Sequence, residues 1–388
     1  MRRRLLLAPL ITSLVAAGCG AAAEPGSRPT AEAGCAAGAT APGDGVYLGV
    51  YPDWAVEPLA DLASSLGSRP AVVGTFMPFP LGPDDERNLD LAVEQVRAEG
   101  GMLLLTLQPD RGLDVVTDEL ARDLADRLAG YNESGVPVIV RFAHEMNGAW
   151  YPWGQQPEAY VAAFRRLADA VHAGAPGSAM MWAPHYGGGY PYAGQQYAAV
   201  AGGADAAVLD TDGDGAVTAA DDPYAPYWPG ASAVDWVGLS LYHWGHSYPW
   251  GENEVPEEGK FLAQMTGEYA GQGGDERAVP DFHAVYGEGH DKPVALAETA
   301  ALWAPGRGGA GELAVKQAWW RQLLDPGVHD RLPRLAMVSW FEFDRAEPEI
   351  GGDPVDWRLA ASPEVRDAFR ADLPGSVRWA DDVPGCTD

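Results

Sequence analysis

The sequence of 388 residues has little positive charge. It contains 26 Lys and Arg residues against 55 Asp and Glu residues, which gives a formal net charge of -29. A surface of that sign repels phosphate groups, so the charge argues against nucleic acid as a partner. No glycine-rich phosphate-binding fingerprint follows the first expected strand, which argues against a dinucleotide-binding fold. The composition fits an exported protein that binds a neutral ligand.

The N-terminus also lacks an apolar run long enough to span a membrane as a mature helix. Its apolar run, Leu5 to Ala17, is too short for this purpose; it follows three arginines and precedes Gly18-Cys19. Residues 15–19 resemble a bacterial lipoprotein signal with Cys19 as the lipid-bearing residue, and ordinary secretory cleavage is the alternative. We expect a signal peptide over residues 1–18 and an extracellular or cell-surface protein, held at a membrane only through lipid on Cys19.

Cysteine is scarce, with three residues in the whole chain. Besides Cys19, only Cys35 and Cys386 remain, one near each end of the mature chain. In an oxidising compartment they are candidates for one disulfide, although the sequence does not show that they come within bridging distance.

The rest of the chain alternates short apolar runs with amphipathic segments. Residues 19–44 are rich in Ala, Gly, Pro and Ser and read as a flexible tether, so we expect one domain over residues 45–388. Segments 89–97, 120–128 and 159–171 repeat apolar residues at three- and four-residue steps, as helices do. The eight apolar runs of strand length are Val46 to Tyr51, Ala71 to Phe76, Met102 to Leu107, Val136 to Phe142, Ala179 to Ala183, Val234 to Leu241, Pro293 to Ala297 and Leu335 to Phe341.

An eightfold alternation of buried strands and helices predicts an α/β protein of the closed (β/α)8 type, the TIM barrel. Functional residues of such barrels lie at the carboxyl ends of the strands. Glu145 follows the fourth run and Glu298 ends the seventh. Two carboxyl groups that converge there suit a retaining glycosidase, in which one acts as nucleophile and the other as general acid and base. The alternative is that both are members of structural ion pairs.

Three segments near these glutamates form a recognisable set: His144-Glu145-Met146-Asn147-Gly148 with Trp150-Tyr151-Pro152-Trp153-Gly154, residues 227–230 and residues 234–242. Together they resemble glycoside hydrolase family 26. The resemblance implies a retaining (β/α)8 barrel that acts mainly on β-mannans, with β-1,3-xylanases and mixed-linkage β-glucanases also among the family's members. It also implies that Glu145 is the acid/base, Glu298 the nucleophile, His144 the histidine beside the acid/base, and Tyr242 a hydrogen-bond donor to the nucleophile.

Other side chains near the two glutamates are candidates for binding sugar. Trp150 and Trp153 follow the acid/base, and Trp340 lies near the end of the eighth run; their rings could stack on a pyranose or belong to the core. Arg141 could bind a sugar hydroxyl, hold a carboxylate or form an ion pair at the barrel mouth. His185 follows the fifth run, where the family usually has Asn, and His243 and Trp244 are expected to line a subsite.

An acidic loop interrupts the chain between the fifth and sixth runs. Residues 210–221 place acidic side chains and a backbone carbonyl in the spacing of a calcium-binding EF-hand loop. We expect a structural Ca²⁺ that orders an insertion over residues 186–224 and no cofactor for catalysis; an acidic turn without metal is the alternative. The predicted ligands are Asp210, Asp212, Asp214, Ala216 and Asp221.

The sequence therefore predicts a monomeric, retaining glycosidase that cleaves a polysaccharide, with endo-β-1,4-mannanase as the leading hypothesis. A β-glucanase or β-1,3-xylanase on the same machinery is one alternative. A carbohydrate-binding lipoprotein without turnover is another, and the presence of both Glu145 and Glu298 argues against it.

Overall fold

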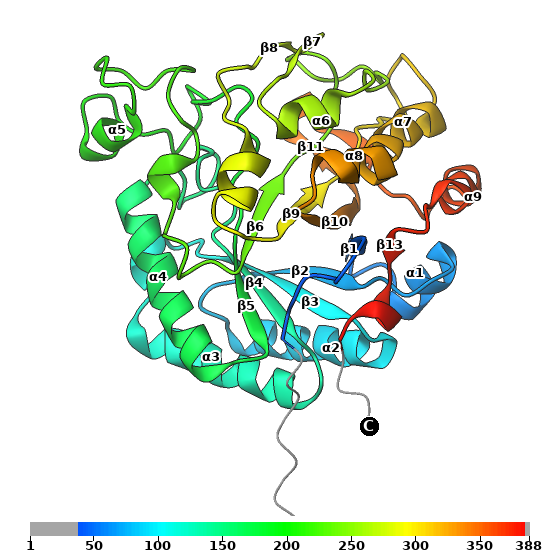
Figure 1. The fold of residues 1–388 in the computed structure, drawn as a ribbon, viewed down its shortest axis with the longest axis horizontal. Coiled ribbons are helices and arrows are strands. Elements are labelled where there is room, and N and C mark those ends of the chain that lie inside the picture. Colours follow the sequence, from blue (N-terminus) through cyan, green and yellow to red (C-terminus); the bar gives the residue numbers. More distant parts are fainter. Residues whose placement is uncertain (1–37, 385–388) are drawn as a thin grey trace, which may run out of the picture. The chain divides into compact units, whose positions relative to one another are not determined.

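Eight parallel strands form a closed barrel in the computed structural model, which describes residues 38–384 (Figure 1). The expected signal peptide, Cys19, Cys35 and Cys386 lie outside these residues. Each barrel strand pairs with the next one along the chain, and the last pairs with the first, so the predicted TIM barrel is confirmed. The strands are β1 (Val46–Pro52), β2 (Val72–Pro78), β3 (Met102–Gln108), β4 (Val138–Phe142), β5 (Ser178–Trp182), β6 (Trp236–Ser240), β9 (Val294–Thr299) and β10 (Leu335–Glu342).

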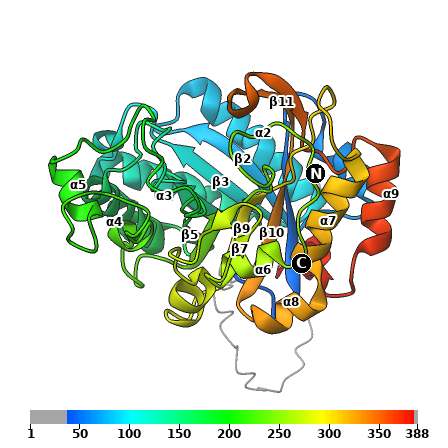
Figure 2. The same cartoon turned by 90° about the horizontal axis from the view of Figure 1, so that it is seen from above.

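The barrel strands coincide with the eight apolar runs of the sequence. They are buried almost throughout, because helices cover one side of the sheet and the opposite side chains fill the barrel interior. The barrel closes where β10 pairs with β1 from Tyr47–Met337 to Pro52–Glu342, beside β9 (Figure 2). Close packing inside the barrel requires a glycine at position 74: a Cβ atom would lie 2.3 Å from the ring of Tyr51, which fills that space.

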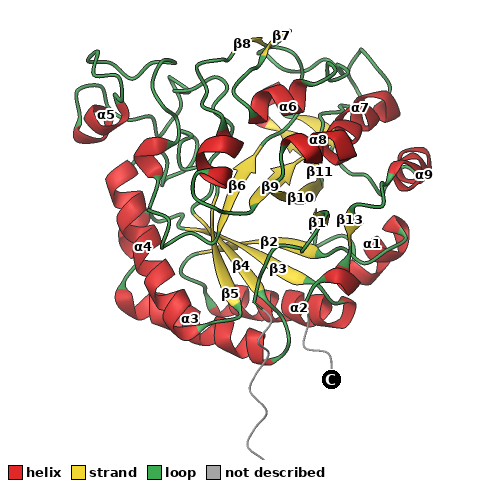
Figure 3. Cartoon of the chain, in the orientation of Figure 1, coloured by secondary structure: helices red, strands yellow, loops and turns green. Residues whose placement is uncertain are grey.

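Helices surround the strands (Figure 3). Their starts follow local chemistry: Pro83 and Pro157 begin two of them, and the hydroxyl of Thr117 accepts a hydrogen bond from the backbone of Leu120. The three segments with helical spacing lie within α2, α3 and α4. The helices are α1 (Leu59–Leu66), α2 (Pro83–Glu99), α3 (Asp118–Glu133), α4 (Pro157–Gly174), α5 (Ala204–Leu209), α6 (Lys260–Met265), α7 (Glu312–Leu324), α8 (Pro326–Arg331) and α9 (Pro363–Asp372).

Long connections lie at the carboxyl ends of the strands, including the expected insertion between β5 and β6, which carries α5. Two small hairpins, β7 (Ala270–Gly271) with β8 (Gly274–Asp275) and β11 (Asp344–Glu347) with β12 (Asp353–Asp356), add to this end of the barrel. The short strand β13 (Val377–Arg378) pairs with the start of β1.

One part of the expected tether belongs to the barrel domain. Ala39 is buried, and its carbonyl accepts a hydrogen bond of 2.8 Å from the indole of Trp236. The composition of residues 19–44 could not predict this contact, because it uses only one small side chain and a backbone carbonyl. None of the helices within residues 38–384 is long and apolar enough to cross a bilayer.

Candidate active site

Glu145 lies three residues beyond β4 in a strained backbone. Its φ is 56°, and that of Ala143 is 45°, so two non-glycine residues adopt the left-handed conformation within three positions. Backbone hydrogen bonds to both neighbouring strands fix this conformation: the N–H of Ala143 donates to Leu107, and that of Glu145 donates to Ala183. Such strain persists where the surroundings fix the chain, and it is concentrated at functional sites.

Two nitrogen atoms face the carboxyl group of Glu145, one at each oxygen. The indole nitrogen of Trp150 donates to Oε2 over 2.9 Å. Nδ1 of His185 lies 3.5 Å from Oε1. Burial acts to raise the pKa of Glu145, but the approach and charge of His185, with smaller contributions from His144 and Arg141, hold it below its ordinary value.

Glu298 is the second-to-last residue of β9, and each of its carboxylate oxygens accepts one strong hydrogen bond. Nη1 of Arg141 lies 2.6 Å from Oε2, and the hydroxyl of Tyr242 donates to Oε1 over 2.5 Å. Of the three roles that the sequence allowed for Arg141, the structure shows the second: the guanidinium holds a carboxylate. Charge-assisted hydrogen bonds of this kind are about twice as strong as neutral ones, and they fix both the charge and the direction of the group.

Arg141 itself is wholly buried inside the barrel, beneath Glu298. Its Nη2 donates to Ser240 over 2.5 Å, and its Nη1 approaches the hydroxyl of Tyr51 at 3.4 Å. Burial alone lowers the pKa of Arg141, but the neighbouring Tyr51, Glu298 and Glu145 outweigh this effect and raise it. A buried cation without a partner is costly, so Arg141 and Glu298 stabilise each other's charged forms.

The two candidate carboxyl groups lie close together. Side-chain oxygens of Glu145 and Glu298 and a ring nitrogen of His144 are all within 4.8 Å of one another. Retaining glycosidases hold their carboxyl groups about 5–5.5 Å apart, whereas inverting enzymes need about 6.5–9.5 Å to admit a water molecule. Both groups are largely enclosed, with exposures of 7% for Glu145 and 8% for Glu298.

His144 lies in the wall of the site and is neutral. Burial and the charge of Arg141 lower its pKa to about 3. Its ring packs between Phe76 and Tyr151, with centroid distances of 5.8 and 5.0 Å. A neutral imidazole at this position adds no positive charge beside the two carboxylates, and it can still exchange hydrogen bonds.

The tryptophans separate into exposed and buried groups. Trp150 is partly exposed and remains a candidate for contact with sugar. Trp153 and Trp340 are buried, and each donates its indole N–H to a backbone carbonyl, of His144 and Trp357 respectively. The expectation that these two rings stack on substrate is therefore wrong: Trp153 supports Tyr151 from below, at 4.4 Å, and Trp340 belongs to the core.

The expectation that His243 lines a sugar subsite is also wrong. This histidine is buried, its Nε2 faces the carbonyl of Glu254, and the ammonium of Lys260 lies 3.3 Å from its Nδ1. This packing against a later segment holds the connection after β6 in place. Its neighbour Trp244 is partly exposed, at 5.0 Å from the ring of Trp357.

Two residues of the site were missed in the sequence. Ser240 ends the apolar strand β6, and the hydroxyl group in that setting was the signal for a buried polar partner, which is Arg141. Asn147 exchanges two hydrogen bonds of 2.8 Å with the backbone N–H and carbonyl of His185, so it ties the segment after β4 to the segment after β5.

Three of the predicted calcium ligands come together in the insertion. Carboxylate oxygens of Asp210, Asp212 and Asp214 lie within 4.8 Å of one another. Asp221 is buried and is not part of this group: its oxygens accept hydrogen bonds from the backbone of Thr211, Asp212 and Thr218, which closes the loop.

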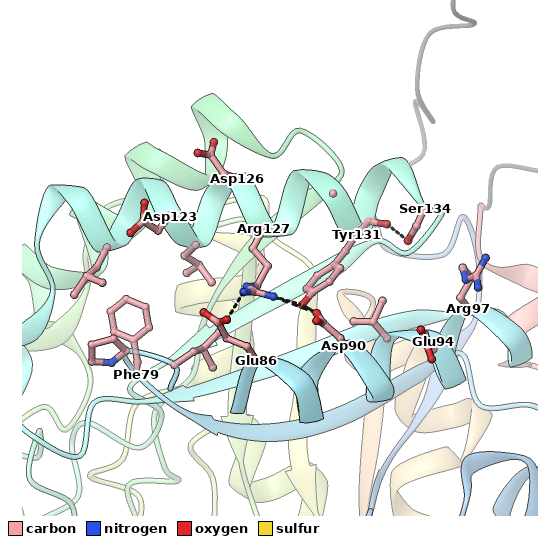
Figure 4. Close-up of a pocket in the computed structure, with 16 residues that line it drawn as sticks. Phe79, Glu86, Asp90, Glu94, Arg97, Asp123, Asp126, Arg127, Tyr131 and Ser134 are labelled. Carbon is pink, nitrogen blue, oxygen red and sulfur yellow. Dashed lines mark hydrogen bonds and ion pairs between the residues drawn. The ribbon is translucent and has the colours of Figure 1, made fainter. Parts of the chain in front are cut away.

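A groove of about 870 Å³ lies away from the two glutamates, between α2 and α3 on the outside of the barrel (Figure 4). Arg127 crosses it and pairs with Glu86 and Asp90 at 3.0 and 3.1 Å, and Tyr131 donates to Asp90. None of the predicted site residues lines this groove. It is a space between two neighbouring helices, bridged by surface ion pairs.

A closed (β/α)8 barrel with two carboxyl groups this close has the arrangement found in retaining glycoside hydrolases. Residues 109–201, which include β4, Glu145 and Trp150, match the sequence pattern described as glycosyl hydrolase family 26. Over these residues the chain is similar to glycoside hydrolase family 26. The expected resemblance is confirmed.

A curated relative and two solved structures are similar to larger parts of the chain. Endoglucanase H of Acetivibrio thermocellus is 21% identical over 286 residues, which are 71% of this chain and 25% of the relative, so the chain spans about a quarter of that protein's length. A Muricauda protein named GH26C superposes with a TM-score of 0.53 at 13% identity, covering 88% of each chain. A modular endo-β-1,4-mannanase of Cellulomonas fimi superposes with a TM-score of 0.52 at 16% identity, covering 87% of this chain and 73% of its own. At these identities the two structures establish the fold alone.

Proposed function

We propose that the chain hydrolyses β-linked polysaccharide with retention of configuration, with Glu298 as the nucleophile and Glu145 as the acid/base. The observation that carries the proposal is the pair itself. Carboxylate oxygens lie within 4.8 Å of each other, and only Glu298 receives charge-assisted hydrogen bonds from an arginine and a tyrosine. The fixed carboxylate suits attack on a sugar, and the other carboxyl suits proton transfer.

The geometry divides the reaction into two steps. In the first, an oxygen of Glu298 attacks the anomeric carbon while Glu145 gives its proton to the leaving oxygen, which produces a covalent glycosyl-enzyme. In the second, Glu145 accepts a proton from water as the water oxygen attacks the same carbon and the bond to Glu298 breaks. Arg141 and Tyr242 hold Glu298 in position in both steps.

The leading substrate is β-1,4-mannan, as the sequence resemblance implies, and the mannanase of Cellulomonas fimi shares the fold. A β-glucan is the second candidate, because the curated relative is named an endoglucanase. A reducing-sugar screen over mannan, glucomannan, mixed-linkage β-glucan and β-1,3-xylan separates these possibilities. Activity on the glucan alone would replace mannan as the substrate.

Substitution of either glutamate tests the roles directly. We expect Glu298→Ala and Glu145→Gln each to lower hydrolysis of the best polysaccharide by about three orders of magnitude or more, with an unchanged circular dichroism spectrum. Near wild-type activity in either variant would refute the assignment. No turnover by the wild-type protein on any of the four glycans, together with binding to one of them, would favour the carbohydrate-binding alternative.

We also propose that the loop over residues 210–221 binds Ca²⁺ as a structural ion. Asp210, Asp212 and Asp214 supply clustered carboxylate oxygens, the ligand type that Ca²⁺ prefers. Export with a lipid on Cys19 is proposed on the sequence of residues 1–19, and mass spectrometry of the membrane-extracted protein tests it.

A further inference from the structure

The two chemical steps described above assign no role to His185, although it faces the acid/base. Its Nδ1 lies 3.5 Å from Oε1 of Glu145, which is too long for a hydrogen bond, and this nitrogen has no hydrogen-bond partner among residues 38–384. The side chain of His185 is 22% exposed, whereas that of Glu145 is 9% exposed. The imidazole is therefore more exposed than the carboxyl group that its Nδ1 faces.

The position of this imidazole is fixed from two sides. Asn147 binds both the backbone N–H and the carbonyl of His185 over 2.8 Å, and it lies only two residues beyond Glu145. The ring contacts Trp150 edge-on at 5.0 Å and Tyr192 at 5.9 Å. One short segment thus fixes both the carboxyl group and the histidine that faces it.

Trp150 decides which oxygen of Glu145 can carry a proton. An indole N–H only donates, so Oε2, which accepts from Trp150 over 2.9 Å, is engaged as an acceptor. The protonated form of Glu145 then carries its hydrogen on Oε1. This is the oxygen that faces Nδ1 of His185.

The other charged and titratable groups around Glu145 do not compete for this proton. Arg141, from β4, is paired with Glu298 from β9, and His144 is neutral because burial and Arg141 lower its pKa to about 3. The remaining groups, Tyr151, Tyr192 and Tyr242, all have pKa values raised by burial, so they stay uncharged.

We propose that His185 keeps Glu145 ionised during the second step. Without the imidazole, the buried carboxyl group would take a proton from solvent; with it, Nδ1 of His185 takes up that proton. The proposal rests on the role of Glu145 as acid/base in the proposed function. In the first step Glu145 has given its proton to the leaving group, and it must stay ionised to act as a base toward water. A protonated imidazole beside Oε1 favours the ionised form of the carboxyl group over the neutral acid.

The pH dependence of one variant tests this role. His185→Asn keeps a planar polar side chain but cannot take up a proton. The substrate is a 2,4-dinitrophenyl β-glycoside of mannobiose or cellobiose, whichever the wild-type enzyme cleaves, because its good leaving group makes the second step limit kcat. Loss of the imidazole removes its lowering effect on the pKa of Glu145, so this pKa rises and the base is lost at a higher pH.

We expect the acidic limb of the kcat profile to move upward by about one pH unit or more. His290→Asn is the matched control, because His290 precedes β9 at the opposite end of the barrel and packs on Trp228; its profile should not move. His185→Gln serves as a second variant with the same expected shift.

An unmoved acidic limb, or an equal fall in kcat at every pH, would overturn the role of His185 while leaving the proposed function intact. Full activity of Glu145→Gln on the same glycoside would instead overturn the acid/base assignment, and the role of His185 with it.

Discussion

Removal of one hydroxyl group, that of Tyr242, isolates the contact that holds the proposed nucleophile. In Tyr242→Phe, Oε1 of Glu298 loses the donor at 2.5 Å while Arg141 remains on Oε2. The phenyl ring can keep its packing against Trp357 and Phe341, at 5.3 and 6.1 Å, so the change is confined to one hydrogen bond.

The magnitude follows from the kind of bond. A hydrogen bond to a charged group contributes about 1.5–3 kcal/mol, and each 1.4 kcal/mol corresponds to about a tenfold change in rate. We therefore expect kcat/KM on the best polysaccharide or aryl glycoside to fall by roughly 10- to 150-fold. The loss should be carried mainly by kcat, because Tyr242 acts through Glu298 and not through a separate contact with bound substrate.

Tyr160→Phe is the matched control. The hydroxyl of Tyr160 is also buried, but it has no hydrogen-bond partner among the described residues, and it lies on α4 at the outside of the barrel. Its removal should leave kcat/KM unchanged and the protein as stable as before or slightly more stable. If Tyr242→Phe kept wild-type kcat/KM, or if both variants lost activity equally, the argument that Tyr242 fixes the nucleophile would be refuted.

Three further predictions concern the rest of the site and the fold. Gly148→Ala should lower kcat at least tenfold, because a Cβ atom would lie 2.4 Å from the Trp150 ring and displace the indole that donates to Glu145. Gly130→Ala in α3 is the control: a Cβ atom there meets open space, so this variant should retain full activity. Burial raises the pKa of Glu342 to about 7, whereas the ordinary value of 4.5 applies in the unfolded chain. Between these pH values the folded state holds a proton that the unfolded chain has released, so the free energy of unfolding falls as the pH rises. Urea unfolding should therefore show Glu342→Gln more stable than wild type by up to about 3 kcal/mol at pH 8, with little difference near pH 4, and an equal difference at both pH values would contradict this. Chelation should lower the melting temperature of the wild type but not of Asp212→Asn, and an unchanged wild type with no copurifying metal would disprove the calcium site.

The sequence predicted the barrel because its strands are buried on both sides and therefore stand out as apolar runs. The positions of Glu145 and Glu298 followed, since the carboxyl ends of parallel strands meet at one end of the barrel. The contact between Tyr242 and Glu298 was implied by the family resemblance, and the contact between Arg141 and Glu298 was one of three roles that stayed open until the neighbours of Arg141 were placed.

Burial of aromatic residues outside the strands could not be predicted in this way. Trp150 and Trp153 are three positions apart in one irregular segment, yet the first is partly exposed and the second is buried under Tyr151. The burial of each ring depends on the left-handed backbone at Glu145 and on contacts with later segments, and no local sequence pattern encodes either. The clamp of Asn147 on His185 is a similar case, because it joins two connections 38 residues apart.

The anomeric configuration of the first product tests the central claim most directly. Proton NMR of the wild-type enzyme acting on its best β-linked oligosaccharide records the new reducing end before mutarotation. Two carboxyl groups with oxygens within 4.8 Å predict that the β anomer forms first and the α anomer appears only later. Initial release of the α anomer would mean that water attacks the sugar directly, and it would contradict the double displacement on Glu298.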